Sequence, residues 1–131
     1  MNLFEQTIDA GTSGLIIMAE SMAEILADKI VALAMRPNRV MNRDLWDIYQ
    51  LRVQNIDLPI GLVKQQLFDR QIDFSYFKQR YTERLTQLET QQQVFWREMQ
   101  RFLNPEVYSD EFTDESWWGN LLYLLRDWGN F

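Results

Sequence analysis

The sequence predicts a mainly α protein, a helical bundle of about five to six helices with a short extended or β segment at the N-terminus. Apolar residues recur at helical spacing along most of the chain. Asp, Asn and Ser caps and two of the prolines mark where these segments begin and end. One short stretch near the N-terminus instead has the continuous apolar run of a buried strand.

That stretch is "GLIIMA" (Gly14–Ala19), which follows a Gly-Thr-Ser-Gly turn. We therefore expect residues 1–20 to form an extended arm or strand and residues 21–131 to be helical, all within a single domain 1–131. A lone strand leaves its backbone groups unpaired, so this segment should pair with something outside the sequence or pack as an arm.

The helices are expected in order along the chain. Ser21 opens the first in a capping box with Glu24, and Pro37 ends it. Asn42 caps the second, while Asp57 caps a third that has Pro59 in its first turn. That third helix is expected to run to about Arg70, and the later helices from Asp73 to about residue 88, over 91–103, and from 114–116 to about 129.

The last of these helices is apolar almost all round its circumference. Such a helix is either central in the fold or buried against a partner. We therefore also expect a homo-oligomer formed through this aromatic helix. Its apolar residues are Trp117, Trp118, Leu121, Leu122, Tyr123, Leu124, Leu125 and Trp128.

Composition limits the chemistry of the chain. It has 131 residues, a net charge of −6, no cysteine and no histidine. Disulfides, thiolate chemistry, histidine bases and the usual zinc sites are therefore excluded. The longest apolar run is far shorter than a membrane span, and no leader pattern is present, so we expect a cytoplasmic protein without a membrane partner. Carboxylates, lysine, arginine and hydroxyls remain for function.

Four of those groups gather in "KIVALAMRPNRVMNRDLWDIYQLR", on two helices joined around Pro37. Antiparallel packing of such a hairpin would bring Lys29 close to Asp44 or Asp47. One interpretation is structural: Arg43 pairs with Asp47, Asp44 favours the helix N-terminus, and Lys29 bridges the helices. The other is functional: a lysine holds a phosphate and a carboxylate accepts a proton from an attacking hydroxyl. Spacing alone leaves both open.

Two motifs here resemble a known family. "MAEILADKIVALAM" followed by "NRDLWDIYQL" is similar to the paired C-terminal motifs of the AbiEii nucleotidyltransferase-like toxins, a Glu-x-x-x-Glu-Lys helix and an Arg-Asp-x-x-Asp-Leu-Tyr helix. Asp28 stands where the family has glutamate, and Ile48 where it has leucine. "FWREMQRFL" resembles a later family helix, so the resemblance spans roughly residues 15–103.

The resemblance implies nucleotide transfer to RNA or protein by the toxin of a type IV toxin–antitoxin system used in phage defence. By motif, Asp44 and Lys29 would be the catalytic residues, with Asp44 the essential carboxylate and candidate base. In the cofactor-binding set, Lys29 would contact the nucleotide phosphate or ribose, and Arg43 and Asp47 would orient the site. No metal ligand is assigned.

The family's N-terminal half holds the phosphates and Mg²⁺ through a Gly-Ser motif and an Asp-x-Asp pair. This sequence contains no Asp-x-Asp, and its "GTSG" lies just before the first helix. We therefore expect this chain to be the C-terminal helical half alone and to be inactive by itself. It should bind no cofactor in isolation, and a nucleoside triphosphate with Mg²⁺ if the missing half completes the site. Its partners would be a cognate antitoxin or a chain carrying that half, with nucleic acid only as a transfer acceptor.

The alternative is a non-enzymatic α-helical binding or oligomerisation protein in which the charged cluster is purely structural. The two hypotheses predict different geometry. An inherited site should direct Lys29 and Asp44 into a common open groove, whereas a structural cluster should pair them and close them off.

Overall fold

The protein is built from helices throughout the part that the computed structural model describes, which comprises residues 11–37, 42–102 and 116–131, with side chains from residue 21 onward. These ranges contain no strand, so the mainly α prediction is confirmed. The helices are α2 (Gly11–Met35), α3 (Asn42–Val53), α4 (Ile60–Asp69), α5 (Phe74–Leu88), α6 (Gln92–Met99) and α8 (Ser116–Trp128).

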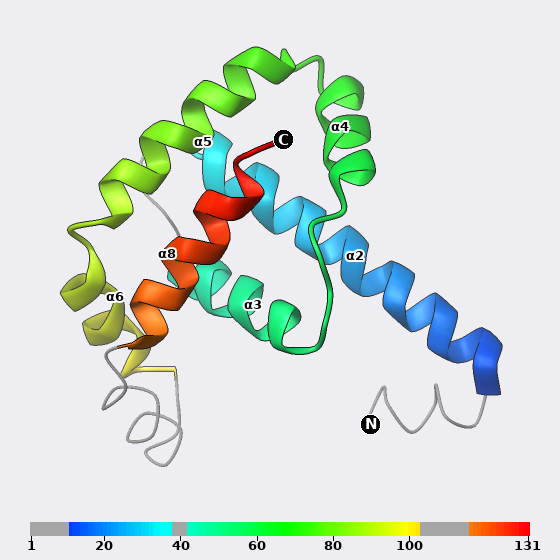
Figure 1. The fold of residues 1–131 in the computed structure, drawn as a ribbon, viewed down its shortest axis with the longest axis horizontal. Coiled ribbons are helices and arrows are strands. Elements are labelled where there is room, and N and C mark those ends of the chain that lie inside the picture. The colour runs from blue at the N-terminus through cyan, green and yellow to red at the C-terminus, as the bar shows by residue number, and fades with distance from the viewer. Residues whose placement is uncertain (1–10, 38–41, 103–115) are drawn as a thin grey trace.

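Helix α2 is the centre of the bundle. It packs against α3, α4 and α5, while α6 packs on α3 and α8 on α5 (Figure 1). The reason is its apolar face: Leu26, Ile30 and Leu33 recur at helical spacing and are fully buried. The first turns of α2 extend past the other helices (Figure 1). The buried C-terminal half of α2 is therefore the part that can position a site.

The prediction of a strand or extended segment at Gly14–Ala19 is wrong, because α2 begins at Gly11 and runs without a break to Met35. Ser21 consequently lies inside a helix and cannot act as its N-cap. A short apolar run fits a buried strand or part of a helix equally well. Here the run continues directly into the alanine- and leucine-rich segment, and the helix extends through both. Residues 1–10 of the expected arm lie outside the described residues.

Two helices end in left-handed residues that are not glycine. Asn55 has φ 66° after α3, and Gln71 has φ 58° after α4. In both cases the next amide reaches back to the helix: Ile56 N–H donates to the Leu51 carbonyl (3.2 Å) and Ile72 N–H to the Leu67 carbonyl (2.8 Å). This is the Schellman arrangement, which satisfies carbonyls at a helix C-terminus.

The predicted cap of α5 is confirmed. The Asp73 carboxylate accepts a hydrogen bond from the Ser75 amide (3.3 Å), and α5 starts at Phe74. The predicted Asp57 cap of α4 is not formed. Asp57 instead accepts hydrogen bonds from the Leu58 amide (2.8 Å) and from Trp128 Nε1 (3.1 Å), which connects the α3–α4 loop to α8.

The last helix packs within its own chain. Its inner face is buried, and the Trp117 ring lies between Phe95 of α6 (5.1 Å between centroids) and Trp46 of α3 (5.5 Å), stacked on both. At the other end, the buried Tyr81 hydroxyl donates to the Leu125 carbonyl (2.5 Å). Tyr123, by contrast, is 75% exposed. The aromatic content of α8 is therefore accounted for largely by the core, and oligomerisation through it stays a prediction.

Candidate functional site

The site begins at the α2–α3 hairpin, which brings together the charges predicted from the sequence. The Lys29 ammonium lies 2.7 Å from Asp44 Oδ1 and 3.1 Å from Asp47 Oδ2. Asp44 and Asp47 reach one ammonium because they are i, i+3 on α3 and share a face. The expected approach of Lys29 to α3 is confirmed, and it involves both aspartates.

Arg36 also belongs to this group, although sequence reasoning did not single it out. Its Nη2 lies 3.1 Å from Asp44 Oδ2, on the opposite side of the carboxylate from Lys29. The contact is ionic: Asp44 Oδ2 and Arg36 Nε have no hydrogen-bond partner among the described residues. Lys29 and Arg36 are i, i+7 on one helical face, and that spacing was the available signal.

Asp44 is the inner member of this cluster and Asp47 the outer one. The Asp44 side chain is 8% exposed, Lys29 26% and Asp47 42%. Partial burial by itself would lower the pKa of Lys29, but its hydrogen bonds to the two aspartates and their charges outweigh burial and raise that pKa. Lys29 is therefore held firmly charged, with only its outer side facing solvent.

Arg43 lies elsewhere. Its guanidinium is 5.1 Å from the centroid of the Phe102 ring, a cation–π contact at the end of α6. The expectation that Arg43 pairs with Asp47 is not met, since Asp47 contacts Lys29 instead. Beside Arg43, Asn42 Nδ2 donates to Glu98 Oε2 (2.6 Å) and fixes the start of α3 against α6. In this structure Arg36, not Arg43, is the arginine that contacts Asp44.

Two arginines of α5 hold the end of α2 next to this cluster. Arg84 donates from Nε to the Leu33 carbonyl (2.9 Å) and from Nη2 to the Arg36 carbonyl. Arg80 donates from Nε to the Ala34 carbonyl (3.2 Å) and from Nη2 to the same Arg36 carbonyl (2.9 Å). These are carbonyls that a helix C-terminus leaves unpaired, and cations are favourable there.

Arg84 is buried, at 5% exposure. Burial lowers its pKa, and the neighbouring Arg80 charge lowers it further. A guanidinium nevertheless stays protonated at neutral pH. The end of α2 is therefore fixed by two positive charges, and this fixes the backbone from which Arg36 reaches Asp44.

The carboxylates of the cluster do not fit a divalent metal. Mg²⁺ and Ca²⁺ need free carboxylate oxygens, but Asp44 faces Lys29 on one oxygen and Arg36 on the other, and Asp47 faces Lys29. Two positive charges already balance the two negative ones. No group of three or more acidic side chains able to hold a metal is found within the described ranges.

Of the two geometries expected for Lys29 and Asp44, an open groove or a closed pair, the structure has the pair. Lys29 and Asp44 contact each other directly, and Asp44 is nearly closed off from solvent. This is the geometry that the structural interpretation predicted. What the cluster can still do chemically is limited to its exposed edge, where the Lys29 ammonium can meet an anion.

A family model described as "Nucleotidyl transferase AbiEii toxin, Type IV TA system" matches residues 2–116. The fold and the charged hairpin thus belong to a nucleotidyltransferase class of toxins, and the chain is a member of the AbiEii family. The match extends beyond residues 15–103, where the motif resemblance was seen. No curated protein and no solved structure matches the chain.

Membership has general consequences. A nucleotidyltransferase family uses a nucleotide and a metal ion, and a type IV toxin family has an antitoxin as partner. Across the described part of the chain, no helix has the length and apolar character needed to cross a bilayer.

Proposed function

We propose that this chain supplies the helical part of an AbiEii-type nucleotidyl transfer site, in which Lys29 binds a phosphate of the nucleotide. The observation that carries the proposal is the position of Lys29, a lysine of the matched region held charged at the solvent-facing edge of a fixed carboxylate pair. A lysine ammonium is a common phosphate ligand because it offers a compact positive charge with three donors.

In this proposal Asp44 positions Lys29 rather than accepting a proton. A general base must lie within hydrogen-bond reach of the acceptor hydroxyl. Asp44 has one oxygen on Lys29 and the other facing Arg36, and its side chain is 8% exposed. Asp47, at 42% exposure, is the carboxylate that an incoming nucleotide displaces from Lys29. Arg36 completes the positioning of Asp44.

The proposal also holds that the metal-binding part comes from elsewhere. The sequence has no Asp-x-Asp, and the described carboxylates of the hairpin are compensated by cations. The chain by itself should therefore not catalyse transfer. A segment or chain carrying the Gly-Ser and Asp-x-Asp motifs would restore transfer, with RNA or protein as acceptor. The cellular role would be that of a cytoplasmic toxin restrained by its antitoxin in phage defence.

Calorimetric titration of the four nucleoside triphosphates with Mg²⁺ tests nucleotide binding. We expect saturable binding to the wild type, its loss in Lys29→Ala and its retention in Lys64→Ala. Lys64 is a suitable control because it lies on α4, with its ammonium 5.2 Å from the centroid of the Phe74 ring of α5. Absence of saturable binding to the wild type would refute the proposal.

The second candidate is a helical binding protein whose charged cluster only joins α2 to α3. It is favoured by one observation, the direct and nearly closed Lys29–Asp44 pair. This hypothesis predicts that Lys29→Ala lowers stability and changes no ligand binding. The same titration, combined with unfolding measurements on the two variants, separates the hypotheses.

A further inference from the structure

The end of α2 holds more positive charge than the carboxylates of the described residues balance. Neither Arg80 nor Arg84 forms an ion pair with a carboxylate among the described residues, and Arg84 is 5% exposed. The carbonyls that they cap belong to a helix terminus worth roughly half a negative charge. Two full positive charges face that half charge, and a buried charge is stable only when it is compensated.

The Arg80 and Arg84 guanidinium groups also have N–H donors that form no hydrogen bond with a described residue. Each guanidinium has five N–H groups. Arg84 uses them toward Leu33, Arg36 and Gln87, and Arg80 toward Ala34 and Arg36. At least two N–H groups on Arg84 and three on Arg80 therefore lie outside the hydrogen bonds formed with described residues.

A small cavity lies where these donors meet. It has a volume of about 50 Å³ and is lined by Pro37, Arg80, Glu83, Arg84 and Gln87. The walls offer guanidinium and amide donors, the groups that bind oxyanions through charge-assisted hydrogen bonds.

We propose that this cavity, the α2 end pocket, binds a phosphate group. Arg36 joins it to the Lys29 cluster: the Arg36 carbonyl accepts from Arg80 and Arg84, while its side chain faces Asp44. Arg36 directly follows α2 and is seven residues after Lys29, which is roughly 10 Å along a helix axis. In transfer, a substrate that carries more than one phosphate would contact both places. That role in transfer rests on the proposed function, whereas phosphate binding itself does not.

Among the described residues that line the pocket, Glu83 is the one carboxylate. It is exposed, and its Oε1 accepts a hydrogen bond from Gln79 Nε2 (3.2 Å). Its charge opposes an anion, so its removal should strengthen phosphate binding. Arg80 is the donor to remove in the opposite test, because it is only half-buried and leaves the Arg84 caps in place.

The test is NMR titration of the full chain with pyrophosphate in the absence of Mg²⁺, following the arginine side-chain N–H signals. We expect the Arg80 and Arg84 signals to shift saturably, with affinity about tenfold weaker in Arg80→Gln. Affinity should rise in Glu83→Gln. It should stay within twofold in Lys78→Gln, which removes an exposed cation of the same helix that lies over Phe74.

Arginine signals that do not move at millimolar pyrophosphate, or affinity unchanged in Arg80→Gln, would overturn the proposal. A nucleoside triphosphate and a short single-stranded RNA, titrated in parallel, show which source of phosphate binds more tightly. Lys29→Ala separates this inference from the proposed function. If pyrophosphate still shifts the Arg80 and Arg84 signals of that variant, the pocket binds phosphate even if Lys29 binds no nucleotide. If Lys29→Ala abolishes nucleotide binding but pyrophosphate does not shift the arginine signals of the wild type, the pocket is refuted and the proposed function is not.

Discussion

Lys29 and Asp44 are fifteen positions apart in the sequence, and their side chains meet at 2.7 Å across the α2–α3 hairpin. The contact unites a nearly buried carboxylate with a lysine that keeps one side toward solvent. The contact therefore bears on the stability of the fold and on the proposed nucleotide binding, and these can be measured separately.

The first prediction concerns stability. Lys29→Met keeps most of the aliphatic length and leaves Asp44 with Arg36 as its remaining cation. Breaking a fully buried ion pair costs about 3–5 kcal/mol. Because Lys29 is 26% exposed, we expect a smaller loss of about 1–3 kcal/mol in urea unfolding. Lys78→Met, at an exposed site, should change the unfolding free energy by less than about 0.5 kcal/mol. Equal effects of the two substitutions would contradict this account.

The second prediction concerns alkaline pH. The pKa of Lys29 is raised in the folded protein above its ordinary value of 10.5. The resulting stabilisation is complete below that ordinary value and is lost as pH rises through the higher folded pKa. Burial also raises the pKa of the Tyr81 hydroxyl, which acts in the same direction. Between pH 9 and 11.5, unfolding free energy should fall more steeply in the wild type than in Lys29→Met, which retains Tyr81. Parallel curves would argue against a charged Lys29 pair.

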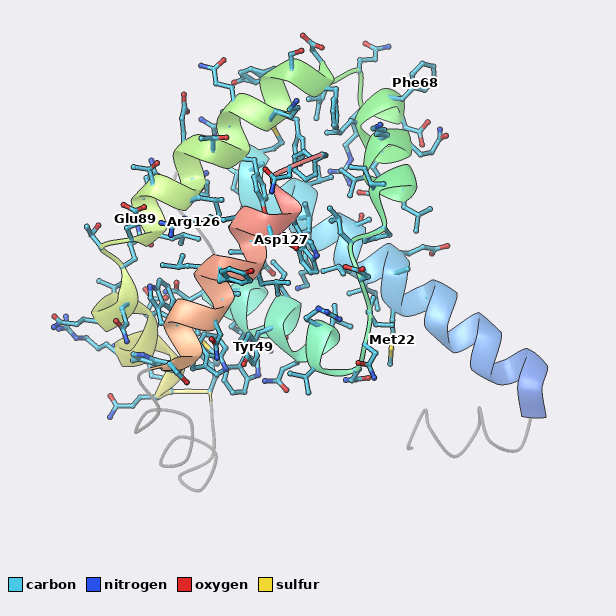
Figure 2. All side chains as sticks on the ribbon, in the orientation of Figure 1. Met22, Tyr49, Phe68, Glu89, Arg126 and Asp127 are labelled. Carbon is cyan, nitrogen blue, oxygen red and sulfur yellow. The ribbon has the colours of Figure 1, made fainter. Side chains whose placement is uncertain are left out.

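The third prediction concerns the arginine cap of α2. Arg84→Leu removes the donor to the Leu33 carbonyl and leaves this buried group unpaired, whereas the Arg36 carbonyl keeps its hydrogen bond from Arg80. We expect a loss of about 1–3 kcal/mol, the cost of one buried unsatisfied group. The control is Arg126→Leu, which removes an exposed ion pair to Glu89 between α8 and the end of α5 (Figure 2) and should cost about 1 kcal/mol or less. Chemical denaturation of both variants makes the comparison, and a smaller loss in Arg84→Leu would contradict the cap.

The fourth prediction concerns the aromatic core. Trp117 is 2% exposed and stacks on Phe95 and Trp46. Trp117→Leu should destabilise the fold by about 2–4 kcal/mol through the cavity it leaves. Tyr123→Leu, at a position 75% exposed on the same helix, should have an effect near zero. Thermal unfolding followed by circular dichroism measures both. Matching stability losses would mean that α8 presents a different face to the core.

Local sequence signals predicted much of the fold. Asp73 before an apolar stripe located the start of α5, and Pro37 located the end of α2. The error at Gly14–Ala19 arose because a six-residue apolar run has no period that separates strand from helix. Its true state depends on the helix that follows it, which a local pattern does not reveal.

The candidate site was predicted in part for a similar reason. The meeting of Lys29 with Asp44 and Asp47 follows from a short hairpin and helical spacing. The Arg84 contact with the Leu33 carbonyl joins positions 51 apart in the sequence. The Arg43 guanidinium likewise lies over the ring of Phe102, which follows α6. Such contacts depend on which helices are neighbours in three dimensions, so no local pattern in the sequence indicates them.

We propose Lys29 as a phosphate ligand that Asp44 and Asp47 hold until a nucleotide binds. The most direct test measures the affinity of a metal-free nucleoside triphosphate, with EDTA present, for the wild type and for Asp47→Asn. Lys29→Ala is the control that gives the binding which does not depend on Lys29. Asp47 is the exposed partner of Lys29, and an exposed pair contributes up to about 1 kcal/mol. We predict that Asp47→Asn binds up to about fivefold more tightly through Lys29. Equal Lys29-dependent affinity of the two proteins, or none in either, would contradict the claim and leave the cluster as a structural joint between α2 and α3.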